Sequence, residues 1–386
     1  MYQALYRKWR PMSFDDVVSQ PHITTTLKNQ IKSGKTAHAY LFTGSRGTGK
    51  TTCARIFAKA INCLDPHDGE PCLECEICKD ADNGTLSDII EIDAASNSKV
   101  DDIRELREGV VYTPERCKYK VYIIDEVHML SAGAFNALLK TMEEPPPHVK
   151  FILATTEIHK VPATIVSRCQ HFDFHRIRNE DIVSRLMYIA SQEGFTLHED
   201  AAGMIARLSD GGMRDALSLL DQCVAYENDI TLDVVSSASG IAGRDYLFDI
   251  LEKIADKDAA GALRVVDKLY DMSKDLKVLA GELLAQMRNV MIIKTIDNNK
   301  DLITCLPDEY ERLKALAERM KLDEILGDIN TLQECSERFA KSTSKRIELE
   351  MCIIKLCGAA QKAGATAQAV SGNAEITVLL NRITQL

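Results

Sequence analysis

The stretch GSRGTGKT at residues 44–51 constrains the fold of this chain more than any other feature. It fits the pattern G-x-x-x-x-G-K-[ST], follows the apolar run AYLFTG and opens the helical pattern KTTCARIFAKAIN. A glycine-rich turn between a strand and a helix aims backbone N–H groups and the helix N-terminus at one point, where a phosphate can bind. A chance glycine turn is the alternative, and the strand–turn–helix context argues against it.

Two side chains of this loop have distinct expected roles. Lys50 reaches the β- and γ-phosphates of a nucleotide, and the Thr51 hydroxyl ligates Mg²⁺. Gly47 and Gly49 let the backbone amides turn inward. The residues expected to bind ATP in this region are Gly44, Ser45, Arg46, Gly47, Thr48, Gly49, Lys50, Thr51 and Thr52.

Short aliphatic runs at 39–44, 88–94, 120–126 and 150–156 alternate with helical patterns in the first part of the chain. This alternation predicts an α/β domain with a parallel sheet flanked by helices, over residues 1–178. After residue 178 the strand patterns stop.

The rest of the chain has helical periodicity. Residues 179–242 read as a small all-helical domain, and residues 243–365 as a second helical bundle, with Leu247, Ile250, Leu251 and Ile254 on one face. Residues 366–386 are expected to be a linker and a short C-terminal helix with one apolar stripe.

An acid pair completes the predicted phosphate site. The apolar strand KVYIIDE ends in Asp125, which can hold the magnesium ion, and Glu126 follows, where it can orient and deprotonate an attacking water. The alternative is a strand-end acid pair that caps a helix. Together with the phosphate loop upstream, the pair favours ATP hydrolysis.

Charge and composition exclude some classes of protein. The net charge of −10 argues against a protein that coats nucleic acid, although residues 1–60 hold ten Lys/Arg against two Asp/Glu. No apolar run is long enough to span a membrane, and the N-terminus has no signal-peptide pattern. We therefore expect a cytoplasmic protein with reduced thiols and no membrane partner.

Four cysteines crowd into residues 62–80 with the spacing C-x₈-C-x₂-C-x₂-C. Four thiolates from one short segment suit a closed tetrahedral site, so we expect a structural Zn²⁺ held by Cys63, Cys72, Cys75 and Cys78. The alternative is that the four cysteines are buried free thiols. That interpretation suits the scattered cysteines Cys53, Cys117, Cys223 and Cys305. The module is expected to be an insertion that stands outward from the core.

At this point a family resemblance becomes specific. The stretch VYIIDEVHMLSAGAFNALLKTMEEPPPHVKFILATTEIHKVPATIVSRCQHFDF resembles the ATPase core of AAA+ clamp-loader subunits, and LYRKWRP followed by FDDVVSQPHI resembles their N-terminal segment. With the four cysteines, the chain resembles the gamma/tau family of bacterial DNA polymerase III over residues 2 to 365. The resemblance implies a lid at 179–242 and a collar that oligomerises at 243–365.

The resemblance also implies roles for single residues. Thr155 or Thr156, at a strand end, would sense the γ-phosphate, unless both are simply solvated. Arg168, in the sequence SRC, would act in trans on the ATP of a neighbouring subunit, where the alternative is a surface arginine. Arg214, at the start of a lid helix, would contact the γ-phosphate of its own chain's ATP.

Alternatives accompany these assignments. Arg214 could instead pair with Asp210 or Asp215. Arg10 is the expected polar contact to the base or ribose, whereas Trp9 is expected to be packing. Candidate contacts to DNA are at two helix starts, where N-capping is an equally good explanation; these are Ser96, Asn97, Lys99 and Ser131.

The implied function is an ATP-driven motor subunit of the replicative clamp loader, in the cytoplasm at the nucleoid. ATP binding would open a sliding clamp and grip primer–template DNA, and hydrolysis would release the clamp. The expected partners are other loader subunits in a hetero-pentamer, the clamp and DNA. Polymerase and helicase would be bound only through a tail that this sequence does not include.

Two alternatives belong to other classes. One is a different AAA+ DNA-processing ATPase, such as a branch-migration motor, which is not expected to carry both SRC and the cysteine cluster. The other is a non-hydrolysing zinc-bearing scaffold subunit, which would typically lack the loop lysine or the acid pair. This chain retains both.

Overall fold

A computed structural model describes residues 3–96, 108–239, 245–297, 307–339 and 344–358, together with a few single residues between these ranges. The chain divides into two compact units, residues 1–239 and 240–386. The sequence VDDIRELREGV at 100–110 has a helical pattern and lies mostly outside the described residues. Residues 366–386, the expected linker and C-terminal helix, lie wholly outside them.

The first unit is built on a parallel five-stranded sheet in the order β2-β3-β4-β1-β5. Every predicted strand is present, and the edge strand β5 is one that the sequence patterns did not reveal. The strands are β1 (Ala39–Gly44), β2 (Ile89–Asp93), β3 (Lys120–Asp125), β4 (Val149–Thr155) and β5 (Gln170–Phe174). Because all neighbouring pairs are parallel, the carboxyl ends of β1, β3 and β4 meet at one edge of the sheet.

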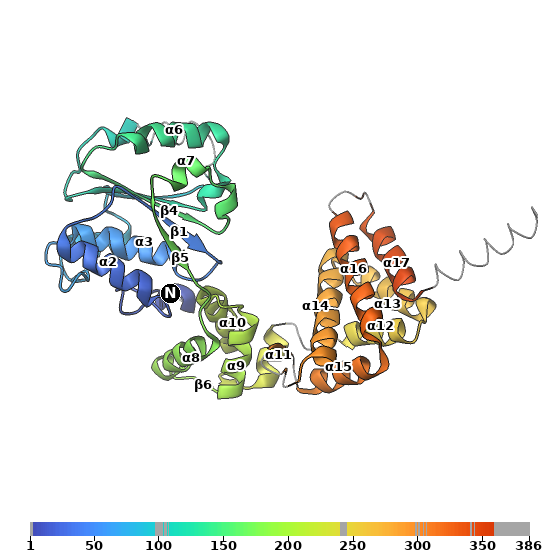
Figure 1. Ribbon diagram of the computed structural model, residues 1–386. Helices are drawn as coiled ribbons and strands as arrows, with labels where there is room; N and C mark the ends of the chain where they lie inside the picture. The colour runs from blue at the N-terminus through green and yellow to red at the C-terminus, as the bar shows by residue number, and fades with distance from the viewer. Residues whose placement is uncertain are drawn as a thin grey trace, which may run out of the picture. The chain divides into compact units, whose positions relative to one another are not determined.

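Helices cover both faces of this sheet, as Figure 1 shows with α2 and α3 on one side and α6 and α7 on the other. Alternate strand residues point into two separate cores: Tyr40 and Phe42 pack with α3, and Leu41 packs on the opposite face. The helical elements around the sheet are α2 (Pro21–Ser33), α3 (Lys50–Asn62), α4 (Glu76–Asn83), η1 (Val127–Met129), α6 (Ala132–Glu143), η2 (Ile158–Lys160) and α7 (Ala163–Val166).

Strand β2 departs from the expectation of a buried strand. It is an edge strand, and its residues are only partly buried or exposed. The apolar run at 88–94 marks the strand correctly, but an edge position leaves one side of it without a neighbour.

A helical part follows the sheet within the first unit. Its helices are α8 (Asn179–Glu193), α9 (Glu199–Leu208), α10 (Met213–Tyr226) and α11 (Leu232–Ala238). The prediction that strands stop after residue 178 is wrong in one detail, because β6 (Thr196–Leu197) pairs in parallel with β7 (Asp229–Ile230). Two residues per strand are too few to show an alternating pattern in the sequence.

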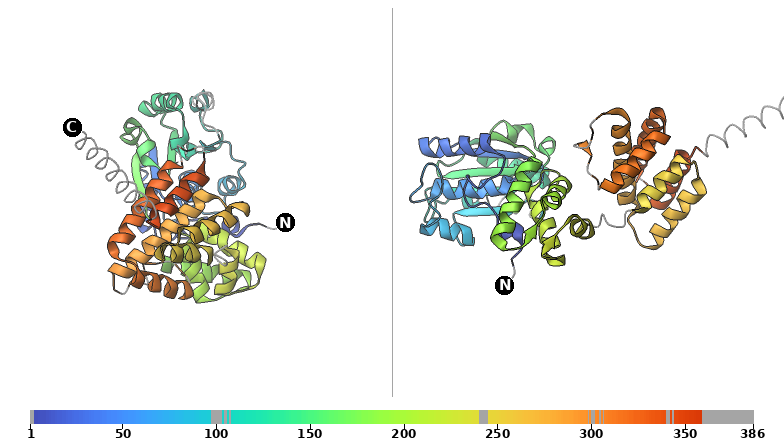
Figure 2. Two further views of the ribbon diagram at one scale, coloured as in Figure 1. Left: turned by 90° about the vertical axis from the view of Figure 1, so that its right-hand side faces the viewer. Right: turned by 90° about the horizontal axis from the view of Figure 1, so that it is seen from below.

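The N-terminal helix α1 (Leu5–Lys8) packs against α10 of this helical part. Figure 1 and the right-hand view of Figure 2 both show the blue N-terminal segment beside the green helices. The first residues of the chain are therefore attached to the helices that follow the sheet.

The second unit consists of helices in its described residues. These are α12 (Asp245–Ala255), α13 (Ala259–Asp271), α14 (Leu276–Thr295), α15 (Pro307–Arg319), α16 (Leu322–Arg338) and α17 (Lys345–Leu356). The predicted apolar face of α12 is buried in one continuous core with residues of the other helices.

No helix in the described part of the chain is both long and apolar enough to cross a membrane.

Candidate functional site

The phosphate loop joins β1 to α3, as its sequence predicts. Gly44, Gly47 and Gly49 all have positive φ, at 133°, 78° and 103°, and Gly49 is the N-cap of α3. The loop is closed by Thr48, whose hydroxyl donates to the carbonyl of Ser45 at 2.9 Å. Backbone amides and the α3 N-terminus therefore gather where an anion is stabilised.

Lys50 lies over this loop and is buried. Its ammonium group donates to the carbonyls of Gly44 and Ser45 at 2.8 and 2.7 Å. Burial lowers the pKa of Lys50, while the carboxylates of Glu126 and Asp125 oppose that shift. The lysine is thus held in the loop together with the acid pair of β3, in reach of a phosphate bound there.

The two predicted magnesium ligands lie together. The Thr51 hydroxyl donates to Asp125 Oδ2 at 2.7 Å, across 74 positions of sequence. The other Asp125 oxygen accepts from the Glu126 backbone N–H at 2.9 Å. A hydroxyl and a carboxylate oxygen side by side next to a phosphate loop form the donor set that Mg²⁺ accepts.

Glu126 has a left-handed backbone conformation, with φ 47°. Its Oε2 accepts a hydrogen bond from the Thr156 hydroxyl at 3.1 Å. A non-glycine residue with positive φ persists where surrounding contacts hold it, and such residues cluster at functional sites.

The two candidate threonines have different surroundings. Thr155 is fully buried, with its hydroxyl 2.9 Å from His128 Nδ1, whereas Thr156 contacts the Glu126 carboxylate directly. His128 also lies 3.1 Å from Glu157 and 3.4 Å from Glu126. Sequence reasoning missed His128, although its place two residues after the acid pair was a signal.

The N-terminal segment brings Arg10 to the start of α3. Arg10 Nε donates to the Thr52 hydroxyl at 3.2 Å. Burial, and then the positive charge of Arg55, lowers the pKa of Arg10 to about 10, so that it stays protonated at neutral pH. Arg10 therefore adds positive charge beside the phosphate loop.

The start of α10 lies directly on the phosphate loop. The Met213 N–H donates to the Gly47 carbonyl at 3.0 Å, and a Cβ on Gly47 would be 2.9 Å from the Cα of Gly212. Arg214 follows, with its guanidinium 5.3 Å from the centroid of the Tyr6 ring. Asp210, one of the alternative partners considered for Arg214, pairs with Arg176.

Arg168 has partners away from the phosphate loop. It follows α7 and donates to the Thr164 carbonyl at 2.8 Å and to Glu143 Oε1 at 2.9 Å. Its side chain is about one-third exposed. These contacts hold the guanidinium on the α6–α7 side of the sheet.

The four cysteines of the 62–80 segment converge. Their sulfur atoms all lie within 4.8 Å of one another, with 4.0 Å between Cys63 and Cys75 and between Cys72 and Cys78. A zinc tetrahedron with Zn–S bonds of about 2.3 Å has sulfurs about 3.8 Å apart, so the cluster fits Zn²⁺. Backbone N–H groups also point at three of the sulfurs, as in a site built for thiolates.

The expectation that this module stands outward is wrong. Gly69 packs so closely on α2 that a Cβ would lie 2.6 Å from the Lys28 carbonyl. Glu70 pairs with Lys28 at 2.9 Å and accepts from the Phe14 backbone N–H at 2.8 Å. Glu70 therefore attaches the module to α2 and to the N-terminal segment.

The candidate DNA contacts are resolved only in part. Ser131 is the N-cap of α6, with its hydroxyl accepting from Ala134 N–H at 3.3 Å. Ser96 lies 3.5 Å from Asp93. Asn97 and Lys99 lie outside the described residues.

Three families of known proteins match successive parts of the chain. Residues 19–178 match "DNA polymerase III, delta subunit", and residues 181–229 match "DNA polymerase III clamp loader subunit, ATPase lid domain". Residues 230–369 match "DNA polymerase III subunits gamma and tau domain III".

Curated relatives are similar along the whole chain. The DNA polymerase III subunit tau of Bacillus subtilis is 43% identical over all 386 residues, which cover 67% of that protein. The tau/gamma subunit of Haemophilus influenzae is 39% identical over 92% of this chain and 51% of its own length. The gamma subunit of Buchnera aphidicola subsp. Schizaphis graminum is 39% identical over 82% of this chain and 87% of its own. The chain thus spans about half to two thirds of the first two relatives.

The similarity to solved structures is weak, both in sequence identity and in TM-score. The Thermotoga maritima RuvB Holliday junction branch migration motor aligns with 64% of this chain and 79% of its own, at a TM-score of 0.45 and 19% identity. The Bacillus subtilis DNA clamp loader delta protein aligns with 86% and 99%, at a TM-score of 0.36 and 14% identity.

Proposed function

Because the chain belongs to the gamma and tau subunit family of DNA polymerase III, with an AAA+ α/β core followed by a helical lid, we propose that it is an ATP-hydrolysing motor subunit of a clamp loader. The observation that carries the proposal is the contact of Thr51 with Asp125, beside a phosphate loop that holds Lys50. In this proposal residues 1–178 are the motor core, 179–242 the lid and 243–365 the collar.

The phosphate loop binds the triphosphate of ATP. Its backbone amides contact the phosphates, and Lys50 exchanges its two carbonyl partners for the β- and γ-phosphates. Thr51 and Asp125 would hold Mg²⁺, which neutralises charge on the phosphates. Arg10, next to Thr52, contacts the base or ribose.

Glu126 is the general base in the proposed hydrolysis. It takes a proton from a water that attacks the γ-phosphorus while the bond to the β–γ bridging oxygen breaks, leaving ADP and phosphate. Thr156, bonded to Glu126, is the better candidate of the two threonines for sensing the γ-phosphate. Arg168 would enter the site of a neighbouring subunit, where such arginines accelerate related reactions by about 10³–10⁵.

Arg214 would couple the nucleotide to the position of the lid. Its backbone directly follows the contact of Gly212 with Gly47, so its side chain would be within reach of a γ-phosphate bound at the loop. Loss of that phosphate removes the attraction, and the lid can then rotate. In an assembly with other subunits, this movement would open the sliding clamp around primer–template DNA and later release it.

The cysteine module would bind zinc in a structural role. A zinc ion held by these four sulfurs would have no position left for a substrate.

The test is clamp loading by the assembled loader with Lys50→Ala. We expect nucleotide-dependent loading to fall at least about 100-fold, since the loop loses the cation that contacts the phosphates. Lys35→Ala, which removes an exposed lysine outside the site, is the matched control. Normal loading by Lys50→Ala would show that the proposed mechanism is wrong.

A second variant distinguishes a motor from a non-hydrolysing scaffold. Glu126→Gln keeps the shape of the side chain but removes the base, so ATP should still bind while steady-state turnover by the assembled complex falls about 100-fold or more. Turnover that does not depend on Glu126 would favour the scaffold.

A further inference from the structure

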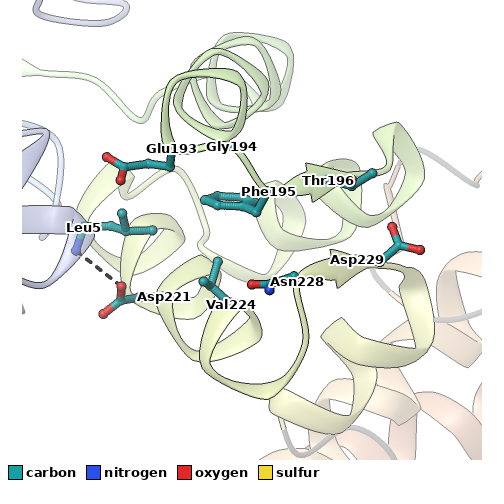
Figure 3. Close-up of a pocket in the computed structure, with 9 residues that line it drawn as sticks. All are labelled: Leu5, Glu193, Gly194, Phe195, Thr196, Asp221, Val224, Asn228 and Asp229. Atoms are coloured by element: carbon teal, nitrogen blue, oxygen red, sulfur yellow. Dashed lines mark hydrogen bonds between the residues drawn. The ribbon is translucent and has the colours of Figure 1, made fainter.

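The N-terminal segment, residues 5–10, connects the lid to the phosphate-loop helix. Leu5 is buried and its N–H donates to Asp221 of α10 at 3.4 Å. Figure 3 shows this contact at the edge of a cavity of about 460 Å³, which Leu5 lines together with lid residues from the ends of α8 and α10. At its other end, the segment contacts α3 through Arg10 and Thr52.

Trp9 makes the shortest polar contact of this segment to the lid. Its indole N–H donates to Glu193 Oε1 at 2.6 Å, and its ring lies edge-on to Tyr188 with centroids 5.8 Å apart. Arg185 stacks near both rings, at 5.9 and 5.5 Å. We call Trp9, Tyr188 and Glu193 the tryptophan latch.

The negative charge of Glu193 is unfavourable at its position unless a positive group or a hydrogen-bond donor lies nearby. It is the last residue of α8, and a carboxylate at a helix C-terminus opposes the helix dipole. The Lys8 ammonium, at 2.7 Å, supplies the exposed partner, and the indole supplies a directed hydrogen bond. The hydrogen bond from Lys8 is the largest cause of a lowered pKa of Glu193; burial opposes it, and the hydrogen bond from Trp9 adds a smaller downward effect.

The same segment carries two groups that face the nucleotide site. Tyr6 lies under the guanidinium of Arg214, and Arg10 is bonded to Thr52. The positions of Arg10 and Arg214 relative to one another are therefore set through the five consecutive residues 6–10, and Trp9 of the tryptophan latch lies among them.

We propose that Trp9 is a positioning residue for ATP: the tryptophan latch holds the lid and the N-terminal segment together so that Arg10 and Arg214 reach one nucleotide. The inference rests on the proposed function and adds a regulatory contact to it. Because the coupling is reciprocal, bound ATP stabilises the latch by the same factor by which the latch strengthens ATP binding.

The chain contains one tryptophan, which makes the latch directly observable. In the 386-residue chain, ATP with Mg²⁺ should change the emission of Trp9 as the ring and its acceptor become more rigidly held. The dissociation constant for ATP and the emission change are measured in one titration, and turnover at saturating ATP is measured separately in the assembled loader.

Three variants separate positioning from simple structural loss. Glu193→Ala removes the acceptor, and we expect the ATP dissociation constant to rise about tenfold with loss of the emission change. Glu193→Gln keeps an acceptor for the indole, so a rise of about threefold is expected. Glu199→Gln, on the exposed first turn of α9, should leave both unchanged. Turnover at saturating ATP should change less than about twofold in all three, since saturating ligand restores the bound conformation.

Trp9→Phe covers the case in which Glu193→Ala does not fold. It keeps an aromatic ring against Tyr188 but removes the N–H donor, and a rise of about fivefold in the ATP dissociation constant is expected. Because this variant has no tryptophan, its dissociation constant is measured by isothermal titration calorimetry, with the wild-type chain measured in the same way. Unchanged ATP affinity in the Glu193 variants, with wild-type binding intact, overturns this inference alone. A wild-type chain that does not bind ATP overturns the proposed function as well.

Discussion

Two chemical centres lie at the two ends of the helix α3, and they are built in opposite ways. At its N-terminus, the phosphate loop meets residues from the ends of β3 and β4, the N-terminal segment and the lid. At its C-terminus, Cys63 meets three cysteines that all lie within the next fifteen residues. One centre is assembled by the whole fold and the other by a single loop.

The two centres should therefore be maintained by different forces. The proposed nucleotide site is positioned by the parallel sheet and by close packing, so its geometry should survive the loss of a local ligand. The cysteine module has few buried apolar side chains of its own, and metal binding should replace the core that it lacks.

The largest expected effect comes from removing the proposed zinc. A chelator, or Cys75→Ser, should unfold the 62–83 region locally, because structural zinc contributes on the order of 10 kcal/mol to such modules. Proteolysis of this region should increase strongly, and added zinc should restore resistance after chelation. ATP affinity should change less than about twofold. Loss of ATP binding with the module still folded would contradict the separation of the two centres.

The second prediction concerns a substitution that changes the packing between the phosphate loop and the lid. Gly47→Ala introduces a Cβ 2.9 Å from the Gly212 Cα at a position with φ 78°, so the lid must move away from the loop. We expect ATP affinity to fall at least about 100-fold. The matched control is Gly34→Ala. Gly34 also has a positive φ, but the space around it is open, so this substitution should cost only about 1 kcal/mol of stability.

The third prediction concerns a contact that joins the last turn of α3 to α4. Lys59 is buried and pairs with Asp82 of α4 at 2.7 Å. Asp82→Asn leaves a buried ammonium without its counter-charge and should reduce stability by about 2 kcal/mol, less than for a fully buried pair because Asp82 is partly exposed. Hydrogen exchange of α3 and α4 amides measures this, with Asp15→Asn as an exposed control. Equal effects of the two variants would show that burial of Lys59 is unimportant.

The smallest effect is a pH dependence at Asp88. Burial raises the pKa of Asp88, but backbone hydrogen bonds from Arg116, Glu115 and Cys117 outweigh it, and the net shift is downward. A carboxyl whose pKa is lowered on folding stabilises the fold above its unfolded value near 3.8, and this contribution is lost as pH falls through the folded value.

Asp88→Asn should therefore lower stability by about 1 kcal/mol at neutral pH and flatten its dependence below about pH 4. Thermal denaturation at several pH values checks this. An unchanged pH profile would mean that these backbone bonds do not favour the ionised form.

The comparison also explains what the sequence could predict. The loop at 44–51 and the four cysteines are local patterns, and the structure brings their residues together as expected. The contact of Thr51 with Asp125 was predictable because strand ends in a parallel sheet meet at one edge.

The contacts that sequence reasoning missed join distant segments without a spacing rule. Trp9 was expected only to pack, yet its indole is bonded to Glu193, 184 positions away. Gly212 reads as a helix boundary, and its role as the surface on which Gly47 packs appears only in three dimensions. The edge strand β5 has charged and polar residues at alternate positions, and so it lacks the apolar run that marked the other strands.

The order of the strands has a consequence for synthesis of the chain on the ribosome. Strand β1, which carries the phosphate loop, lies between β4 and β5, and those strands begin only at Val149 and Gln170. While the chain emerges, β1 has no hydrogen-bonded neighbour in the sheet, because its pairs with β4 and β5 form only after the intervening residues are made. The cysteine cluster needs nothing beyond Cys78 and can capture its metal long before. A nascent chain should therefore acquire zinc first and the ability to bind ATP last.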